Sequence, residues 1–316
     1  MRAPDFWRHD GVLPAVLAPA AALWAAATAR RVARPGWRAP ARVICCGNAT
    51  VGGTGKTTLA LDLGARLRRR GVAAAFLTRG YGGRARGVLR VDPARHDAAL
   101  VGDEALLLAA VAPTYVAADR AEGARAAIAE GAAVLVMDDG LQNPTLAKDL
   151  SLLVVDGAVG FGNDRVLPAG PLREPLVAAA ARCRAVVLIG EDARGAAARL
   201  PPALPVLRAA LAPDGAIPAG QRVLAFAGIG RPDKFFDLLA ASGVEVAARR
   251  PFPDHHRFTE AELRALLAEA ARLDALAVTT PKDAVRLAPH HRTRVAVSGV
   301  RLVWQDEAEI ERLLDA

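Results

Sequence analysis

The chain has 316 residues, 53% of them hydrophobic, which suits one large or two modest domains with a substantial core. Its formal net charge of +8 favours anionic partners: nucleotides, nucleic acid, or phosphate-bearing lipid at a membrane surface. Three cysteines, of which Cys45 and Cys46 are adjacent, exclude a disulfide framework and indicate a reducing, cytoplasmic setting.

The first distinctive segment, residues 11–29, is uncharged and mostly apolar, and three arginines follow it by residue 34. A spanning helix needs about 20 apolar residues, so the length is borderline, and two prolines and many alanines weaken it. A signal peptide would carry its basic residues before the apolar run instead. One interpretation is a buried helix packed on the domain. We favour a helix that lies in the membrane interface without spanning it, with Trp24 at headgroup level.

From residue 42 onward, short apolar runs alternate with helical patterns, which predicts an α/β fold with a mostly parallel sheet flanked by helices. The proline-rich stretch 200–220 is typical of a linker, and the alternation then resumes. We predict a membrane-associated helix within residues 1–35, a core domain over 36–214 and a smaller α/β domain over 215–316. The expected strands in the core are VICC, AAAFLT, PTYVAA, AAVLVMDD, LSLLVVD and AVVLIG.

The segment TVGGTGKT lies between the strand VICC and a helical pattern, where a phosphate-binding loop (P-loop) is expected. Glycines let backbone N–H groups surround phosphate oxygens, and the helix points the positive end of its dipole at them. Lys56 can then reach the β- and γ-phosphates, and the Thr57 hydroxyl can ligate Mg²⁺. The sequence therefore predicts a P-loop NTPase-like fold that binds ATP and Mg²⁺. The expected nucleotide-binding residues are Thr50, Val51, Gly52, Gly53, Thr54, Gly55, Lys56 and Thr57.

Two consecutive aspartates, Asp138 and Asp139, end a later expected strand. P-loop proteins place a carboxylate at a neighbouring strand end to hold magnesium, directly or through water. A plain turn is the alternative, because Asp-Gly favours turns. The sequence leaves open which of the two aspartates touches the metal.

Three further segments could supply the residues that act on the phosphate acceptor. Asp103 and Glu104 begin a helical pattern, where an acidic pair is favoured by the helix dipole alone. His255 and His256 follow an aspartate in PDHH, although a histidine pair in a loop is more often solvated than catalytic. The proline-punctuated stretch LPAGPLREP at 167–175 offers an arginine and a glutamate, or it is a plain connection.

Taken together, these motifs resemble the tetraacyldisaccharide 4′-kinase family of Gram-negative bacteria over roughly residues 40–290. The resemblance implies transfer of the γ-phosphate of ATP to the 4′-hydroxyl of an acylated glucosamine disaccharide 1-phosphate, giving lipid IVA in lipid A biosynthesis. It also implies an enzyme held peripherally on the cytoplasmic face of the inner membrane, with its active site between a P-loop core and a smaller domain. The motifs occur in the order TVGGTGKT, LTRGYGG, GDEALLL, DDGLQ, FGNDRVLPAGPLREP, FAGIGRPDKFF, FPDHH and VTTPKDAVRL.

By the motif match, Asp103 is the expected catalytic base and His255 its partner, preferred over His256. The chemistry agrees, because a sugar hydroxyl must lose its proton as it attacks phosphorus, and a carboxylate tuned by a histidine can accept it. Lys56 is expected to act on the moving phosphoryl group. The expected substrate-binding residues are Arg79, Arg120, Gln142, Arg173 and Glu174, with the three arginines as phosphate clamps and Arg173 ranked first.

Two positions depart from the family pattern: Asn143 stands where a histidine is expected, and Asp164 where glycine is usual. The main rival function is a membrane-surface ATPase switch of the MinD/ParA kind, but Val51 replaces the lysine that such proteins use. A nucleic-acid-binding ATPase would explain the charge, yet the arginines are dispersed and aromatic residues make up only 4%. We therefore expect no nucleic-acid partner and no obligate protein partner.

Overall fold

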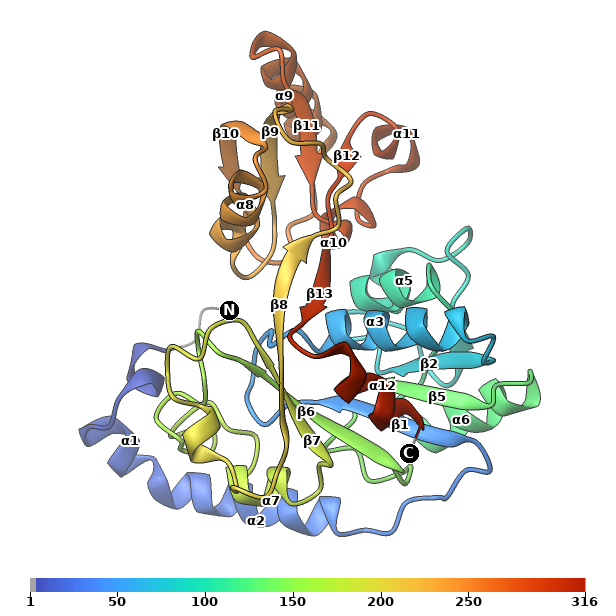
Figure 1. The fold of residues 1–316 in the computed structure, drawn as a ribbon, viewed down its shortest axis with the longest axis vertical. Coiled ribbons are helices and arrows are strands. Elements are labelled where there is room, and N and C mark those ends of the chain that lie inside the picture. The colour runs from blue at the N-terminus through green and yellow to red at the C-terminus, as the bar shows by residue number, and fades with distance from the viewer. Residues whose placement is uncertain (1–3, 316) are drawn as a thin grey trace.

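The computed structural model describes residues 4–315 and has two parts, each built on a sheet with helices on both faces (Figure 1). The larger sheet has nine strands in the order β13-β8-β7-β6-β1-β5-β2-β4-β3, and only the edge strands β3 and β13 run antiparallel to their neighbours. The predicted α/β fold with a mostly parallel sheet is confirmed. The strands of this sheet are β1 (Arg42–Gly47), β2 (Ala74–Thr78), β3 (Leu89–Arg90), β4 (Thr114–Val116), β5 (Val134–Asp138), β6 (Leu150–Asp156), β7 (Ala185–Ile189), β8 (Val206–Pro213) and β13 (Val300–Trp304).

Both faces of the larger sheet are buried, which explains why its strands read as continuous apolar runs. In β1, Val43 and Cys45 face the cluster with α6 and α7, whereas Ile44 and Cys46 face α3, α5 and α12. The helical segments of this part are η1 (Asp5–Arg8), α1 (Val12–Val16), α2 (Ala18–Val32), α3 (Lys56–Arg69), α4 (Ala98–Val101), α5 (Asp103–Ala109), α6 (Arg120–Ala129), α7 (Leu176–Ala180), η2 (Ala197–Arg199) and α12 (Glu307–Asp315).

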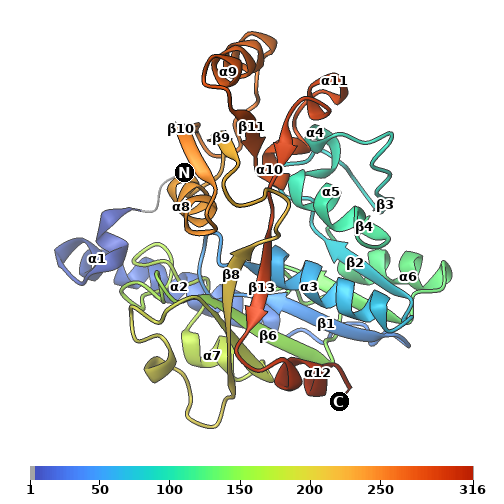
Figure 2. The same ribbon diagram turned by 45° about the horizontal axis from the view of Figure 1, so that its top comes forward.

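The smaller part has a four-stranded parallel sheet in the order β10-β9-β11-β12. One face of β9 packs on Phe235 and Phe236 of α8, and the other face packs on Leu263 and Leu266 of α9. Figure 2 shows these helices on opposite sides of the sheet. The elements are β9 (Arg222–Ala227), α8 (Pro232–Ala241), β10 (Glu245–Pro251), α9 (Glu260–Arg272), β11 (Leu276–Thr279), α10 (Pro281–Ala284), α11 (Pro289–Arg292) and β12 (Ala296–Val297).

The chain passes between the two parts twice, through β8 on the way out and β13 on the way back (Figure 1). These strands pair antiparallel, with Leu302 opposite Leu211, so β13 belongs to the larger sheet. The helix α12 then packs its Ile310 and Leu314 into the core beside α3. The sequence predicts that residues 215–316 stay together in the smaller domain. Residues 300–315 instead return to the larger part, because β13 supplies the edge that β8 would otherwise expose.

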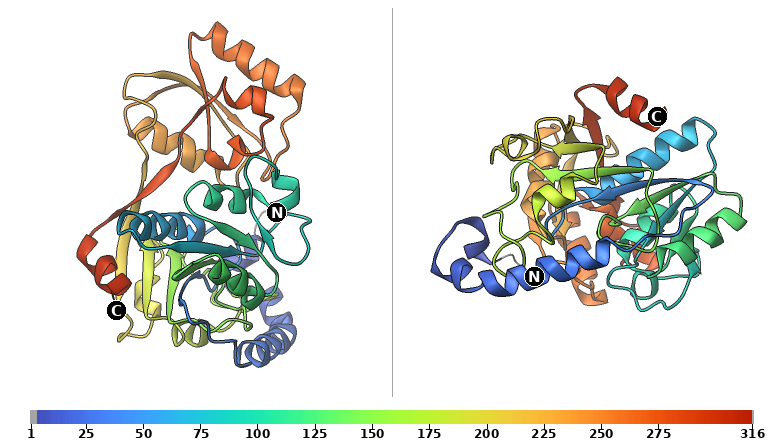
Figure 3. Two further views of the ribbon diagram at one scale, coloured as in Figure 1. Left: turned by 90° about the vertical axis from the view of Figure 1, so that its right-hand side faces the viewer. Right: turned by 90° about the horizontal axis from the view of Figure 1, so that it is seen from below.

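The N-terminal segment forms two helices, α1 and α2, where a single hydrophobic helix over residues 11–29 was expected. The helical hydrogen bonding is interrupted at Leu17, which is the last-turn cap of α1 and the first cap of α2. Within residues 4–315, no helix has the length and apolar character needed to cross a membrane. Seen from below, α2 runs along the outside of the larger part (Figure 3, right). Its Leu23 side chain is 74% exposed, and Ala21 and Thr28 are its buried residues.

Candidate active site

The TVGGTGKT loop leaves β1 at the carboxyl edge of the larger sheet and enters α3 at Lys56. Gly52 and Gly55 have φ angles of +106° and +95°, which favour glycine, and a Cβ on Gly55 would lie 2.6 Å from Cδ1 of Ile189. The loop is held from one side, because the Val51 N–H donates to the Pro171 carbonyl at 2.9 Å. This strand, glycine turn and 14-residue helix is the arrangement that phosphate binding requires.

Asp138, at the end of β5, lies beside the first turn of α3. The Thr57 hydroxyl donates to Oδ2 of Asp138 at 2.9 Å. Asp138 is 1% exposed, and its Oδ1 has no hydrogen-bond partner among residues 4–315. Burial, together with the nearby negative charge of Glu104, raises the pKa of Asp138 to about 7. A buried carboxylate oxygen without a partner, next to a threonine hydroxyl, fits a divalent cation such as Mg²⁺.

Asp139 differs from its neighbour in every contact. Its φ is +54°, and the Arg173 guanidinium donates to both its oxygens, at 2.8 and 3.2 Å. The Lys56 ammonium lies 3.8 Å from Oδ1 of Asp139. Burial raises the pKa of Asp139, but Lys56 and Arg173 outweigh it and the net shift is downward. Asp139 therefore orients two cations at the loop, and Asp138 is the aspartate with an oxygen free for a metal.

Gln142 and Glu174 are brought together beside the loop. The Gln142 amide donates to the Asn48 carbonyl and to Oε1 of Glu174, both at 2.9 Å, and Arg182 lies 2.6 Å from that Glu174 oxygen. Sequence reasoning missed Asn48, whose buried side-chain amide has no hydrogen-bond partner in the described part of the chain. Its place directly after β1 and before the loop is the signal that could have identified it.

The other two predicted phosphate clamps are not alike. Arg79 is exposed just after β2, at the carboxyl edge of the sheet. Arg120 is buried and donates to the Ala117 carbonyl, and burial lowers its pKa to about 10. Contact of Arg79 or Arg120 with a substrate stays a prediction, as do the substrate contacts of Gln142, Arg173 and Glu174.

Asp103, the predicted base, meets a residue of the smaller part at the start of α5. Its Oδ2 lies 2.9 Å from Nδ1 of His255 and accepts from Nε of Arg286, also at 2.9 Å. Burial raises the pKa of Asp103, but His255 and Arg286 outweigh it and lower the pKa to about 2. Because the carboxylate is ionised and can only accept, Nδ1 of His255 is the donor in this contact.

His256 does not share this contact. Its Nε2 lies 3.1 Å from both carboxylate oxygens of Glu262, and its ring stacks on Phe252 with centroids 4.8 Å apart. The geometry therefore favours His255 as the partner of Asp103, in agreement with the prediction from the motif.

Sequence reasoning did not assign Arg286, Lys282 and Asp283. Lys282 donates to Glu104 at 2.9 Å, and Arg286 lies 3.0 Å from the fully buried Asp283, whose carboxylate accepts the Gly228 N–H at 3.1 Å. All three lie in VTTPKDAVRL, the last of the motifs that carry the family resemblance. Their place in that motif is the signal that could have found them.

The two departures from the family pattern have local explanations. Asn143 Oδ1 accepts the Thr145 N–H at 3.0 Å and thus closes a turn. Asp164 has a φ of +57°, a conformation that glycine adopts freely and aspartate tolerates, and it pairs with Arg199.

The N-terminal segment braces the loop that carries Arg173. The indole of Trp7 donates to the Pro168 carbonyl and that of Trp24 to the Arg173 carbonyl, each at 3.1 Å. Arg165 pairs with Asp10 at 2.6 Å. The N-terminal helices therefore contact the same segment that holds the P-loop.

Comparisons with known proteins agree with one another. The family model described as "Tetraacyldisaccharide-1-P 4'-kinase" (LpxK) matches residues 13–316. A protein named tetraacyldisaccharide 4′-kinase from Gluconacetobacter diazotrophicus is 62% identical over 319 residues, covering 100% of this chain and 98% of that protein. A second, from Rhodospirillum centenum, is 59% identical, covering 99% and 96% respectively.

The fold has a solved counterpart in LpxK from Aquifex aeolicus, described as an "apo" form in complex with ATP. The two structures superpose with a TM-score of 0.76 at 26% identity, covering 96% of this chain and 99% of that one. The match of the family model over nearly the whole chain confirms the resemblance drawn from the motif order. The chain belongs to the tetraacyldisaccharide 4′-kinase family.

Proposed function

We propose that the chain transfers the γ-phosphate of ATP to the 4′-hydroxyl of an acylated glucosamine disaccharide 1-phosphate, giving lipid IVA. Family membership supports this reaction. The observation that supports the residue assignment is that the expected base lies next in sequence to a residue near the expected metal ligand. Asp103 contacts His255, and the next residue, Glu104, is close enough to Asp138 to raise its pKa. The expected base, Asp103, and the expected metal ligand, Asp138, thus lie close together.

The nucleotide end of the site rests on fixed donors. The amides at the start of α3 and the Lys56 ammonium would hold the β- and γ-phosphates, and Arg173 would stabilise the charge on the transferred group. Asp139 positions Lys56 and Arg173 through the contacts described above. Thr57 and Asp138 would hold Mg²⁺, which when bound neutralises charge on the phosphate oxygens.

The acceptor end rests on Asp103. His255 and Arg286 both bind its Oδ2, so Oδ1 is the oxygen that can accept the substrate hydroxyl. With a pKa of about 2, Asp103 is ionised at neutral pH and is a weak base. It would take the proton only as the bond to phosphorus forms, when the hydroxyl becomes acidic. Its main contribution is then to align the attacking oxygen.

We further propose two domains, with the nucleotide domain over 36–214 joined by β13 and α12, and a second domain on the smaller sheet. Because Asp103 and His255 come from different parts, approach of the two parts would complete the site and exclude water. This would limit wasteful ATP hydrolysis.

We also place the protein on the cytoplasmic face of the bacterial inner membrane. Val12 and Val16 of α1 and Leu23 of α2 expose most of their surface, and Arg30 and Arg31 end α2. Exposed apolar side chains next to basic ones are typical of a surface that binds an anionic membrane.

The test is incubation with γ-labelled ATP, Mg²⁺ and acylated disaccharide 1-phosphate in detergent micelles. Label is expected in the lipid, and Asp103→Asn should abolish it while ATP binding persists. Asp97→Asn is the matched control, because Asp97 is an exposed helix cap that asparagine also serves. Label that appears only as inorganic phosphate would refute the kinase and favour an ATPase switch of the MinD/ParA kind.

A further inference from the structure

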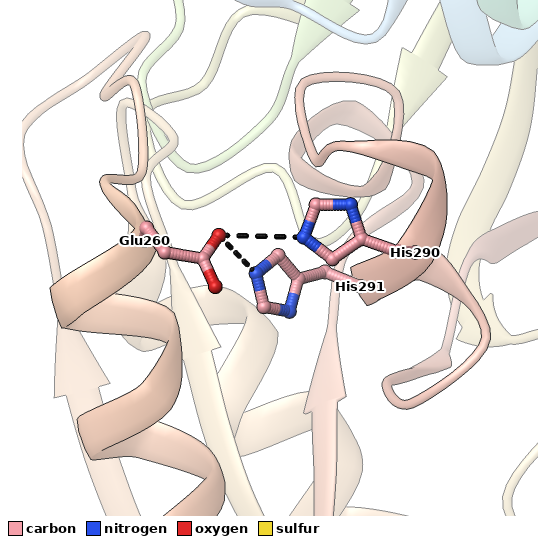
Figure 4. A group of neighbouring side chains, drawn as sticks. All are labelled: Glu260, His290 and His291. Carbon is pink, nitrogen blue, oxygen red and sulfur yellow. Dashed lines mark hydrogen bonds and ion pairs between the residues drawn. The ribbon is translucent and has the colours of Figure 1, made fainter.

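Glu260, His290 and His291 form a cluster in the smaller part that the proposed reaction does not use. Glu260 is the first residue of α9, and the two histidines are neighbours in α11. Figure 4 shows both imidazole rings pointing toward one carboxylate oxygen from across the gap between these helices. The cluster thus joins two segments that lie 30 residues apart in the chain.

The ligand atoms converge closely. Oε2 of Glu260 lies 2.7 Å from Nε2 of His291 and 3.3 Å from Nε2 of His290. One ligand atom from each of the three residues lies within 4.8 Å of the others. Tetrahedral zinc with bonds of 2.0–2.1 Å separates its ligand atoms by roughly 3.3 Å. Shifts of at most about 1.5 Å in the exposed side chains would therefore accommodate an ion.

The three side chains of the cluster differ in how deeply they are buried. His291 is 1% exposed, so its ring is fixed, whereas Glu260 and His290 are more than half exposed and leave a side open for water. Nδ1 of His291 is buried with no hydrogen-bond partner in residues 4–315. Because Nε2 already faces Glu260, it is the ring nitrogen of His291 that would bind an ion.

A nearby pair shows what an ordinary histidine–carboxylate contact looks like in this chain. His256 contacts both oxygens of Glu262, and the same carboxylate closes the capping box with Thr259. That pair is complete with one histidine. In the cluster, two rings compete for the Oε2 of Glu260, and its Oε1 faces Arg264 at 3.8 Å.

We propose that Glu260, His290 and His291 bind a divalent transition-metal ion, with zinc as the expected class. Two imidazole nitrogens and one carboxylate oxygen, with a position open to water, form a ligand set that suits zinc. Magnesium and calcium prefer oxygen ligands throughout. The ion would link α9 to α11 and is independent of the reaction proposed above.

The test uses the full-length protein, first treated with a chelator to remove bound metal. Saturating Mg²⁺ and ATP are then added, so that the nucleotide site at the P-loop is occupied. Zn²⁺ is titrated against a chromophoric chelator, and Co²⁺ is titrated while its visible absorption is followed. The variants Glu260→Gln and His290→Gln change exposed side chains and should fold normally. His9→Gln is the matched control, because His9 is exposed and lies in the N-terminal segment.

The wild type and His9→Gln are expected to bind one equivalent of Zn²⁺. Loss of an outer partner costs 10- to 100-fold in metal affinity, so loss of a ligand should cost about 100-fold or more. His290→Cys should keep Zn²⁺ binding, because a thiolate is also a zinc ligand. If His290 had only a structural role, cysteine would not restore what His290→Gln loses. Equal Zn²⁺ affinity in the wild type and Glu260→Gln, or no binding by the wild type, would overturn the proposal.

Discussion

Trp24 donates its indole N–H to the backbone carbonyl of Arg173 at 3.1 Å. The same residue, Arg173, binds both oxygens of Asp139 through its guanidinium and donates its N–H to the Ala49 carbonyl at 2.7 Å. One hydrogen bond therefore separates an exposed N-terminal helix from a cation of the phosphate site. We therefore expect the N-terminal segment to position Arg173, in addition to any contact with a membrane.

Trp24→Phe should test this role, because it removes the hydrogen bond and keeps an aromatic ring. A single hydrogen bond contributes about 0.5–1.5 kcal/mol, so turnover in detergent micelles should fall by roughly two- to tenfold. Binding to vesicles should change little. The measurements are kcat in micelles and the bound fraction in a vesicle flotation assay.

Leu23→Ser is the matched control on the same helix. Leu23 is exposed, so this change should weaken vesicle binding and leave kcat in micelles unchanged. If both variants behave alike in both assays, the segment acts only as an anchor and the positioning role is wrong.

Arg286→Gln should change the pH dependence of the reaction. Arg286 and His255 hold the pKa of Asp103 at about 2, so removing the guanidinium moves that pKa upward. Because the pKa of Asp103 is lower in the folded protein than its ordinary value of 3.8, the ionised carboxylate stabilises the fold above pH 3.8. This contribution is lost as the pH falls toward about 2. The variant should therefore show an acid limb of kcat/KM at higher pH, and turnover lower by roughly 100-fold.

Arg292→Gln is the control for this experiment, because Arg292 lies near Arg286 in sequence but, among residues 4–315, donates only to the carbonyls of Leu287 and Val285. Its acid limb should match the wild type. An unchanged acid limb in Arg286→Gln would show that Asp103 does not set the pH dependence.

The parts of the site that sequence could predict are those formed locally. The P-loop is a continuous strand, turn and helix, so spacing alone identifies it. Arg286 contacts Asp103 from 183 positions away, and that contact depends on how the smaller part sits on the larger one. No periodicity in the chain encodes such a contact, so only its motif could have suggested it.

Two further limits have physical causes. Asp138 and Asp139 are chemically identical in a sequence, and the local backbone, with a φ of +54° at Asp139, decides which partners each carboxylate meets. The return of β13 to the larger sheet was also missed. An edge strand that pairs with a segment about 90 residues earlier is not a local signal, because the partner is chosen by the tertiary fold.

Asp138→Asn and Asp139→Asn should separate metal binding from cation positioning. Because Asp138 has the free buried oxygen, its variant should raise the half-saturating Mg²⁺ concentration by about tenfold or more. Asp139→Asn should leave that concentration unchanged and lower maximal turnover by roughly 100-fold, since Lys56 and Arg173 lose their shared partner. Titrating Mg²⁺ at saturating ATP checks both, and the reverse pattern would reassign the metal to Asp139.

The attachment of α12 to the larger part should depend on Arg66. This residue is 6% exposed and contacts Asp62 at 2.7 Å and Glu307 at 2.6 Å, as well as Glu311. Burial alone would lower the pKa of Arg66, but these carboxylates raise it, so the guanidinium is held charged. Arg66→Ala removes the buried guanidinium from the three carboxylates around it and should lower the free energy of unfolding by about 2–4 kcal/mol.

The expected value lies below the range for a fully buried pair, because Glu307 is 60% exposed and water screens its share. Arg69→Ala is the matched control on the same helix, where an exposed side chain should cost no more than about 0.5 kcal/mol. Urea unfolding followed by circular dichroism gives both values. Equal midpoints for the two variants would mean that the apolar contacts of Ile310 and Leu314 hold α12 in place without the ionic network.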